Sequence, residues 1–245
     1  MTEENPVTIT QPQTSTSTRT GDFRIVAVDL YRDVHKAIRS ELFAATVEAG
    51  RIDPADRSGR RALGQRVDDI VEFLVSHAEH EDTSVQPALE VHMPQLAERI
   101  ERDHVGLEAR MVDLRELARV AIDGEPIAQR TGAHHLYLQL ASFTSAYLEH
   151  QDLEERIVMP DLDAAIGVDA VAEIHGAIIA SIPPDVMAQS LALMLPAMNV
   201  DDRTELLGGM QAGAPAEVFA GVWGLADSVL PPADLAALAT RLGLS

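Results

Sequence analysis

Two histidine–glutamate pairs stand out in the sequence because they share one spacing. Glu81 follows His77 by four positions, and Glu154 follows His150 by four positions. Residues four apart lie on one face of an α-helix, so each pair can direct an imidazole and a carboxylate at the same cation. One such pair arises easily by chance in an acidic helical protein. Two pairs on separate helical segments favour a metal site.

Two further histidines lie in the other long helical segments. His35 and His104 both belong to stretches with the apolar periodicity of a helix. Antiparallel helices rise about 1.5 Å per residue, so positions counted from the connecting turns place both histidines at the depth of the two pairs, to within about one helical turn. The sequence therefore predicts one layer of candidate metal ligands: His35, His77, Glu81, His104, His150 and Glu154.

This set of side chains has a defined preference for metals. Four imidazoles and two carboxylates, without sulfur, suit iron, manganese or zinc. We expect a dinuclear centre in which each metal takes two imidazoles, Glu81 and Glu154 bridge the pair, and open positions remain for small oxygen species. An isolated helical histidine is more often a core or surface residue, and that alternative predicts purified protein without bound metal.

Four more side chains are candidates for the surroundings of the centre. Tyr31 and Tyr147 each lie about one helical turn before a candidate histidine, where a phenol could hydrogen-bond a bound oxygen species or ligate ferric iron, although a core tyrosine is the commoner outcome. Glu108 could be a further ligand, a hydrogen-bond acceptor or a carboxylate at the bundle edge. His80 could hydrogen-bond a ligand. The sequence does not identify a catalytic residue.

The order and spacing of the six candidates resemble those of the hemerythrin-like, or HHE cation-binding, proteins. The flanking residues are similar as well, over residues 29–161: His-Glu-Asp at 80–82, Tyr-Leu-Glu-His at 147–150, Glu-Glu at 154–155 and Met-Pro at 159–160. The resemblance implies a four-helix bundle that holds two iron ions, joined by carboxylates and by an oxo or hydroxo bridge. Residues 194–219 are similar to C-terminal extensions of actinobacterial members.

The sequence departs from the oxygen-carrying hemerythrins in two respects. Those carriers use five histidines, including a pair four apart on the third helix, where this chain offers only Ile100 or Glu108 as a partner for His104. They also take a carboxylate from an Asp five residues after the histidine of the fourth helix, where this chain has Glu155. Fewer imidazoles favour oxidised iron and hamper reversible release of oxygen. The chain therefore resembles the subgroup associated with peroxide or nitric oxide chemistry, or the F-box iron sensors.

We interpret the chain as a non-haem di-iron protein that binds or turns over a small oxidant: hydrogen peroxide, nitric oxide or dioxygen. Catalase-like or nitric-oxide-consuming activity would make it an enzyme, and the sequence leaves that question open. The alternative is an oxygen or iron sensor, or an iron-binding module without turnover. A ferritin-like carboxylate enzyme is disfavoured because that class uses Glu-x-x-His motifs.

The composition argues against several other classes of protein. Nineteen Lys and Arg residues against 39 Asp and Glu residues give a net charge of -20, which repels nucleic acid and anionic lipid. The chain has no cysteine, which excludes thiolate metal sites, disulfides and thiol nucleophiles. No apolar run reaches about 18 residues, and residues 1–21 are rich in Thr, Gln and Ser. We expect a cytoplasmic protein with a disordered tail over residues 1–21, a diatomic or peroxide ligand, and no nucleic-acid or membrane partner.

Four long helices are needed to position the candidate ligands. Apolar residues recur with helical spacing over residues 23–50, 58–89, 96–123 and 126–160, with turn or stop signals between these runs. Four long helices joined by short connections form an antiparallel up-down four-helix bundle. The sequence therefore predicts an all-α protein whose bundle occupies residues 22–166.

The C-terminal part of the chain differs in composition from the bundle. Only 11 of the residues from 166 to 245 are charged, against 47 of the preceding 165 residues. Proline and glycine divide residues 167–245 into five short helices, which are too short to be stable alone. We expect this helical C-terminal extension to pack on the bundle or on a second copy of the chain, which would give a homodimer.

Overall fold

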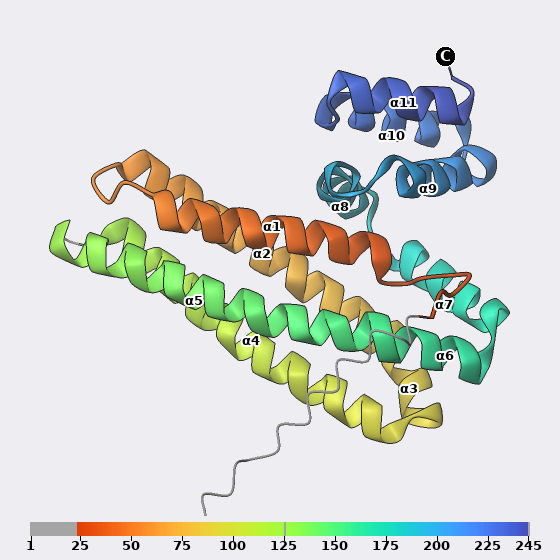
Figure 1. The fold of residues 1–245 in the computed structure, drawn as a ribbon, viewed down its shortest axis with the longest axis horizontal. Helices are drawn as coiled ribbons and strands as arrows, with labels where there is room; N and C mark the ends of the chain where they lie inside the picture. The colour runs from red at the N-terminus through yellow and green to blue at the C-terminus, as the bar shows by residue number, and fades with distance from the viewer. Residues whose placement is uncertain (1–23, 125, 245) are drawn as a thin grey trace, which may run out of the picture.

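The computed structural model describes residues 24–124 and 126–244, and in these ranges it contains helices and no strand. Four long helices lie side by side: α1 (Arg32–Arg51), α2 (Arg57–Ser84), α4 (Pro94–Asp123) and α5 (Pro126–Leu153). In Figure 1 each long helix runs opposite to the one before it. The predicted all-α fold, a helical bundle followed by short helices, is confirmed.

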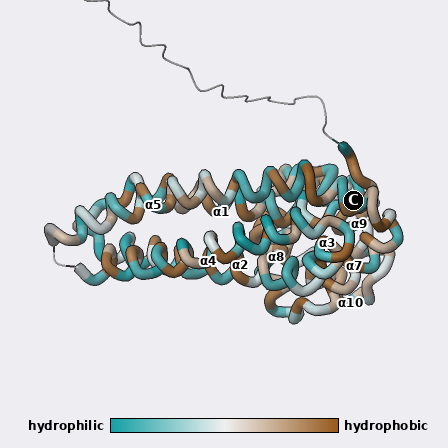
Figure 2. The backbone as a smooth tube through the Cα atoms, turned by 90° about the horizontal axis from the view of Figure 1, so that it is seen from below, coloured by the Kyte–Doolittle hydropathy of each residue, from teal (hydrophilic) through white to brown (hydrophobic). Residues whose placement is uncertain are grey.

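The long helices associate because each buries one apolar face. Along each of them hydrophilic and hydrophobic residues alternate (Figure 2), as in amphipathic helices that line a core. Buried side chains from all four helices meet in one apolar cluster, which we call the bundle core. Its members include Ile38, Leu42, Leu63, Leu74, Leu107, Leu114, Leu136, Leu140 and Phe143.

The first long helix begins later than its apolar periodicity predicts. It starts at Arg32, after an irregular segment in which Asp29 Oδ1 accepts hydrogen bonds from the N–H groups of Tyr31 and Arg32, both at 3.0 Å. Val26 and Leu30 do not extend the helix but pack against a second apolar cluster. The predicted disordered tail over residues 1–21 lies outside the described residues.

The second long helix ends earlier than predicted. It stops at Ser84, and a separate short helix, α3 (Gln86–His92), follows after Val85. Pro87 has no N–H group to donate to the preceding turn and its ring crowds that turn, which favours a break in the helix at this point. The prediction of one helix to residue 89 is therefore wrong at this point.

The fourth long helix continues past its last regular turn. A π-helical turn covers Glu154–Val158 and leads into α6 (Met159–Ile166). In this turn the N–H of Met159 donates to the carbonyl of Glu154, five residues earlier. Pro160 explains the wider turn, because its ring crowds the carbonyl of the preceding turn and supplies no N–H. Gly167 ends α6 with a φ of 81°, a conformation that glycine adopts without strain.

Five short helices follow and gather at one end of the bundle (Figures 1 and 2): α7 (Val168–Ser181), α8 (Pro184–Ala197), α9 (Val200–Gly213), α10 (Ala216–Val229) and α11 (Pro232–Leu242). Helices α8–α11 share a small core of their own, made of Leu195, Leu207, Ala226, Leu230 and Leu238. We call these four helices the C-terminal unit. Its helix α8 packs on α1, whereas α7 packs on α2 and α6.

A second apolar cluster closes the same end of the bundle, and we call it the end core. Helices α3, α6 and α7 contribute to it together with the ends of the long helices. Its buried members are Tyr31, Val85, Leu89, Ala97, Ile100, Leu153, Val158, Met159, Leu162 and Val171.

No single helix in the described part of the chain is long and apolar enough to cross a membrane. One pair of helical segments, residues 128–166 and 168–181, meets the length and composition requirement only when taken together, and the two segments are bent by 117° at their junction.

Candidate metal centre

The six candidate ligands form a polar layer between the bundle core and the end core. On α4, for example, His104 lies between Ile100 of the end core and Leu107 of the bundle core. The apolar clusters on both sides keep water away, which strengthens electrostatic interactions within the layer. The side chain of His77 is 9% exposed, and the other five are buried: His35, Glu81, His104, His150 and Glu154.

The first pair of histidines comes from α1 and α2. The Nε2 atoms of His35 and His77 lie 3.1 Å apart, and the two rings are nearly perpendicular at 82°. Glu81 Oε1 lies 3.1 Å from His77 Nε2, and Glu154 Oε2 lies 3.5 Å from His35 Nε2. Both glutamates therefore direct one oxygen atom at this first pair.

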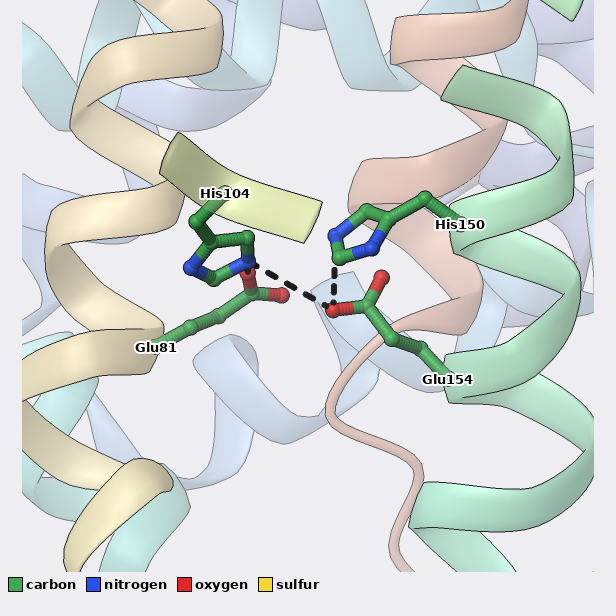
Figure 3. A group of neighbouring side chains, drawn as sticks. All are labelled: Glu81, His104, His150 and Glu154. Carbon is green, nitrogen blue, oxygen red and sulfur yellow. Dashed lines mark ion pairs between the residues drawn. The ribbon is translucent and has the colours of Figure 1, made fainter. Parts of the chain in front are cut away.

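The second pair comes from α4 and α5 and is shown with both glutamates in Figure 3. The rings of His104 and His150 are 4.9 Å apart between centroids. Glu81 Oε2 lies 3.3 Å from His104 Nε2, and Glu154 Oε1 lies 3.1 Å from His150 Nε2. Each glutamate thus directs its second oxygen atom at the second pair.

The two glutamates fit a site that holds cations. Both oxygen atoms of Glu81 and of Glu154, together with Nε2 of His104, are buried and have no hydrogen-bond partner among the described residues. A buried polar atom without a partner costs about 1–3 kcal/mol, and more if it is charged. The ligand atoms form two groups, each within 4.8 Å, that share Glu81. The donor atoms and their missing partners therefore fit a metal site.

Two further carboxylates contact the outer nitrogen atoms of the histidines. Glu155 Oε1 lies 3.0 Å from Nδ1 of His35, and Asp82 Oδ1 lies 2.8 Å from Nδ1 of His104. Arg39 donates two hydrogen bonds to Glu155, at 2.6 and 3.1 Å. A carboxylate on the outer nitrogen fixes the ring tautomer and leaves Nε2 free to bind a metal.

The sequence analysis did not assign these outer carboxylates, although the sequence carries a signal for them. Each follows a candidate bridging glutamate directly, as Glu81-Asp82 and as Glu154-Glu155. In both cases the first acid faces the histidine pairs, and the second acid contacts a histidine on another helix.

Burial sets the protonation of three groups in the layer. Burial lowers the pKa of His77 to about 4 and that of His150 to about 4, although Glu81 opposes both shifts. Burial also raises the pKa of Glu154 to about 7, against the opposing effect of nearby histidines. Two imidazoles are therefore neutral at physiological pH, the state in which a histidine binds a metal.

Charged neighbours, more than burial, determine the pKa values of two other groups. Burial lowers the pKa of His104, but the nearby carboxylates of Glu81 and Asp82 outweigh it and raise that pKa to about 9. Burial raises the pKa of Glu155, but His35 and Arg39 outweigh it and lower that pKa to about 2. Glu155 is therefore a firmly ionised partner for His35.

The structure brings two of the four surrounding candidates to the centre. The ring of Tyr31 lies 5.1 Å from that of His35, and the ring of Tyr147 lies 5.8 Å from that of His150. Burial, then the charges of the two glutamates, raise the pKa of both phenols well above 10.0, so both stay protonated.

The other two surrounding candidates lie apart from the layer. Glu108 is exposed on α4, and His80 is half-buried on α2. Within the described ranges, neither forms a hydrogen bond or an ion pair with any of the six candidate ligands. The structure therefore gives neither of them a contact through which it could assist the centre.

A comparison with protein families agrees with this geometry. The model of the hemerythrin HHE cation binding domain matches residues 26–176, a range that contains all six candidate ligands. Comparison with curated proteins gave no match, and comparison with solved structures gave none either. The match covers more than half of the chain and coincides with a buried group of histidines and glutamates suited to a metal ion. The chain belongs to the hemerythrin HHE cation-binding family.

Proposed function

We propose that the polar layer holds two iron ions and that the protein binds or turns over a small oxidant there. One observation carries this proposal: Glu81 and Glu154 each direct one oxygen atom at the His35–His77 pair and the other at the His104–His150 pair. A carboxylate placed in this way is suited to bridge two cations, each of which also has two imidazoles within reach. Nitrogen and oxygen donors without sulfur suit iron.

When bound, a pair of irons supplies the electrons that are exchanged with hydrogen peroxide, nitric oxide or dioxygen. The protein's contribution is to hold and shield the site. The four histidines and two glutamates fix the positions of the cations, while Glu155 and Asp82 fix two of the rings. The apolar clusters above and below the layer limit access to small molecules.

The two buried tyrosines support chemistry with an oxidant. Tyr31 and Tyr147 lie against one histidine of each pair and retain their phenolic protons. We propose that their O–H groups serve as hydrogen-bond donors to a small molecule that enters the layer.

A second candidate function is an oxygen or iron sensor. It is favoured by the contact between the C-terminal unit and the outer face of α1, the helix that carries His35. In such a sensor, metal occupancy would change how the C-terminal unit is presented to a partner.

The decisive experiment is elemental analysis of protein produced in iron-replete medium, together with its ultraviolet-visible spectrum. We expect about two irons per chain, as the paired ligand groups imply. His104→Ala should lose bound iron, whereas the control His175→Ala, on the exposed side of α7, should retain it. Equal iron content in the two variants would contradict the site.

Iron-loaded protein then separates the two functions. Rapid consumption of hydrogen peroxide or nitric oxide without loss of iron would support the oxidant-processing function. Stable iron without turnover, combined with a large loss of helicity on chelation, would support the sensor.

A further inference from the structure

The helical turn that carries His35 also carries two cations on its outer face. Lys36, the only lysine in the chain, forms an ion pair with Asp202 of α9. Arg32 Nη1 lies 3.0 Å from Oε2 of Glu205, and Arg32 Nε lies 3.7 Å from Oδ1 of Asp202. The C-terminal unit is therefore attached by charge to the residues that flank a candidate metal ligand.

The acidic residue of this contact, Asp202, is held firmly within the C-terminal unit. Asp202 is only 8% exposed and lies in the first turn of α9. The side chain of Asn199 caps this turn by accepting hydrogen bonds from the N–H groups of Asp201 and Asp202, at 2.8 and 3.0 Å. The start of a helix also favours a negative charge. Asp202 is thus held in place at the start of α9.

The next residue ties this turn to the rest of the unit. Arg203 is buried and donates to the carbonyl of Leu195 in α8 at 2.7 Å and to Asp234 of α11 at 2.9 Å. Asp202, which pairs with Lys36 of α1, therefore lies next to a residue that is fixed to the core of the C-terminal unit. Arg203 thus links the first turn of α9 to both α8 and α11.

His35 lies in the first turn of α1, which begins at Arg32. Helix ends have unpaired N–H groups and fray more readily than helix centres. From inside the bundle, His35 is held by Glu155 and contacts His77. From outside, the same turn is held by the ion pairs of Lys36 and Arg32 with α9.

We propose that the C-terminal unit, residues 184–244, is a positioning element of the metal centre, in which Asp202 acts through Lys36 to fix His35. This inference rests on the proposed metal binding and adds to it a role for a region that lies outside the family match, which ends at residue 176. Because coupling between two binding events is reciprocal, docking of the unit tightens metal binding, and bound metal tightens docking.

The test uses the full chain and Co²⁺ as a visible probe ion. Two quantities are measured: the affinity for Co²⁺ by competition with a chelator, and the rise in melting temperature that Co²⁺ produces. Asp202→Asn and Lys36→Met should each weaken Co²⁺ binding about tenfold and reduce the rise in melting temperature. Lys36→Arg, which keeps the charge, and Asp227→Asn, on the exposed side of α10, should both behave like the wild type.

A merely structural contact gives a different result. It would lower the melting temperatures of the metal-free and Co²⁺-loaded proteins equally and leave the Co²⁺ affinity unchanged, and that outcome would overturn the proposal. If Asp202→Asn does not fold, Lys36→Met tests the same ion pair from its more exposed side, and unchanged Co²⁺ affinity in that variant would count against the proposal. A wild type that binds no Co²⁺ contradicts the metal centre itself, whereas wild-type binding with unaffected variants contradicts only the role of the C-terminal unit.

Discussion

The outer nitrogen of His35 lies 3.0 Å from an oxygen of Glu155, while the inner nitrogen of the same ring lies 3.5 Å from an oxygen of Glu154. Two consecutive residues of the chain therefore contact the two nitrogen atoms of one imidazole. The π-helical turn that begins at Glu154 accompanies this arrangement. π-helical turns occur frequently at functional sites.

Replacing Glu155 by Gln should weaken metal binding. The neutral amide is a poorer acceptor for the Nδ1–H group of His35, so the ring is less well oriented and less basic. We expect metal affinity to fall about tenfold, as measured by chelator competition. Glu149→Gln, an exposed change on the same helix, is the matched control. Equal affinities of the two variants would show that Glu155 does not support His35.

Replacing Glu81 by Gln should have a larger effect. Glu81 is shared by both groups of candidate ligands, and its two oxygen atoms have no hydrogen-bond partner in the described part of the chain. We expect a loss of affinity of at least about tenfold at both of the proposed iron positions. The control is Glu108→Gln, which changes an exposed carboxylate on α4. Full metal content in Glu81→Gln protein would exclude Glu81 as a bridge.

The stability of the metal-free protein should rise as the pH is raised through the weakly acidic range. His77 and His150 have a pKa of about 4 in the folded state, below the usual value of 6.5. Between these values the folded state binds fewer protons than the unfolded state, so stability increases with pH. Glu154, with a pKa raised from 4.5 to about 7, opposes this trend but cancels only one of the two histidines.

Above pH 6.5 the same protein should lose stability. The pKa of His104 is raised from 6.5 to about 9, so the folded state binds more protons than the unfolded state over this interval. The free energy of unfolding should therefore be greatest near pH 6.5 when measured by urea denaturation in the presence of a chelator. Stability that rises steadily through pH 9 would contradict the assigned environment of His104.

Replacing Gln151 by Met should stabilise the metal-free protein. Gln151 is fully buried, and both polar atoms of its amide lack a hydrogen-bond partner among the described residues. Methionine has a similar length and no strongly polar atoms, so the free energy of unfolding should rise by about 1 kcal/mol. The exposed change Gln139→Met on the same helix should have little effect. A loss of stability in Gln151→Met protein would mean that the amide has a partner after all.

The fold class could be predicted because the signals for it are local. On α2, for example, Leu63, Val67 and Leu74 recur at helical spacing, and all are buried. The ends of the helices were less predictable, since they depend on individual contacts. The periodicity through Val26 ends in an irregular segment, and the break at Val85 depends on a proline two residues later.

The candidate site could be predicted in part. The spacing of His77 and Glu81 places both on one helical face, and the structure brings this pair together with the other four candidates. The role of each as a ligand stays a prediction. The contacts of Glu155 with Arg39 and of Lys36 with Asp202 could not be predicted, because they join residues 116 and 166 positions apart and have no local pattern.

The polar layer also constrains the order in which the molecule is assembled. His35 and Glu155, which meet in the layer, are 120 positions apart, and every long helix contributes at least one of the six candidate ligands. Contacts between such distant residues require closure of long loops and form late in folding. A partly synthesised chain therefore offers at most single histidine–glutamate pairs, and the complete set of ligands exists only once all four helices have docked.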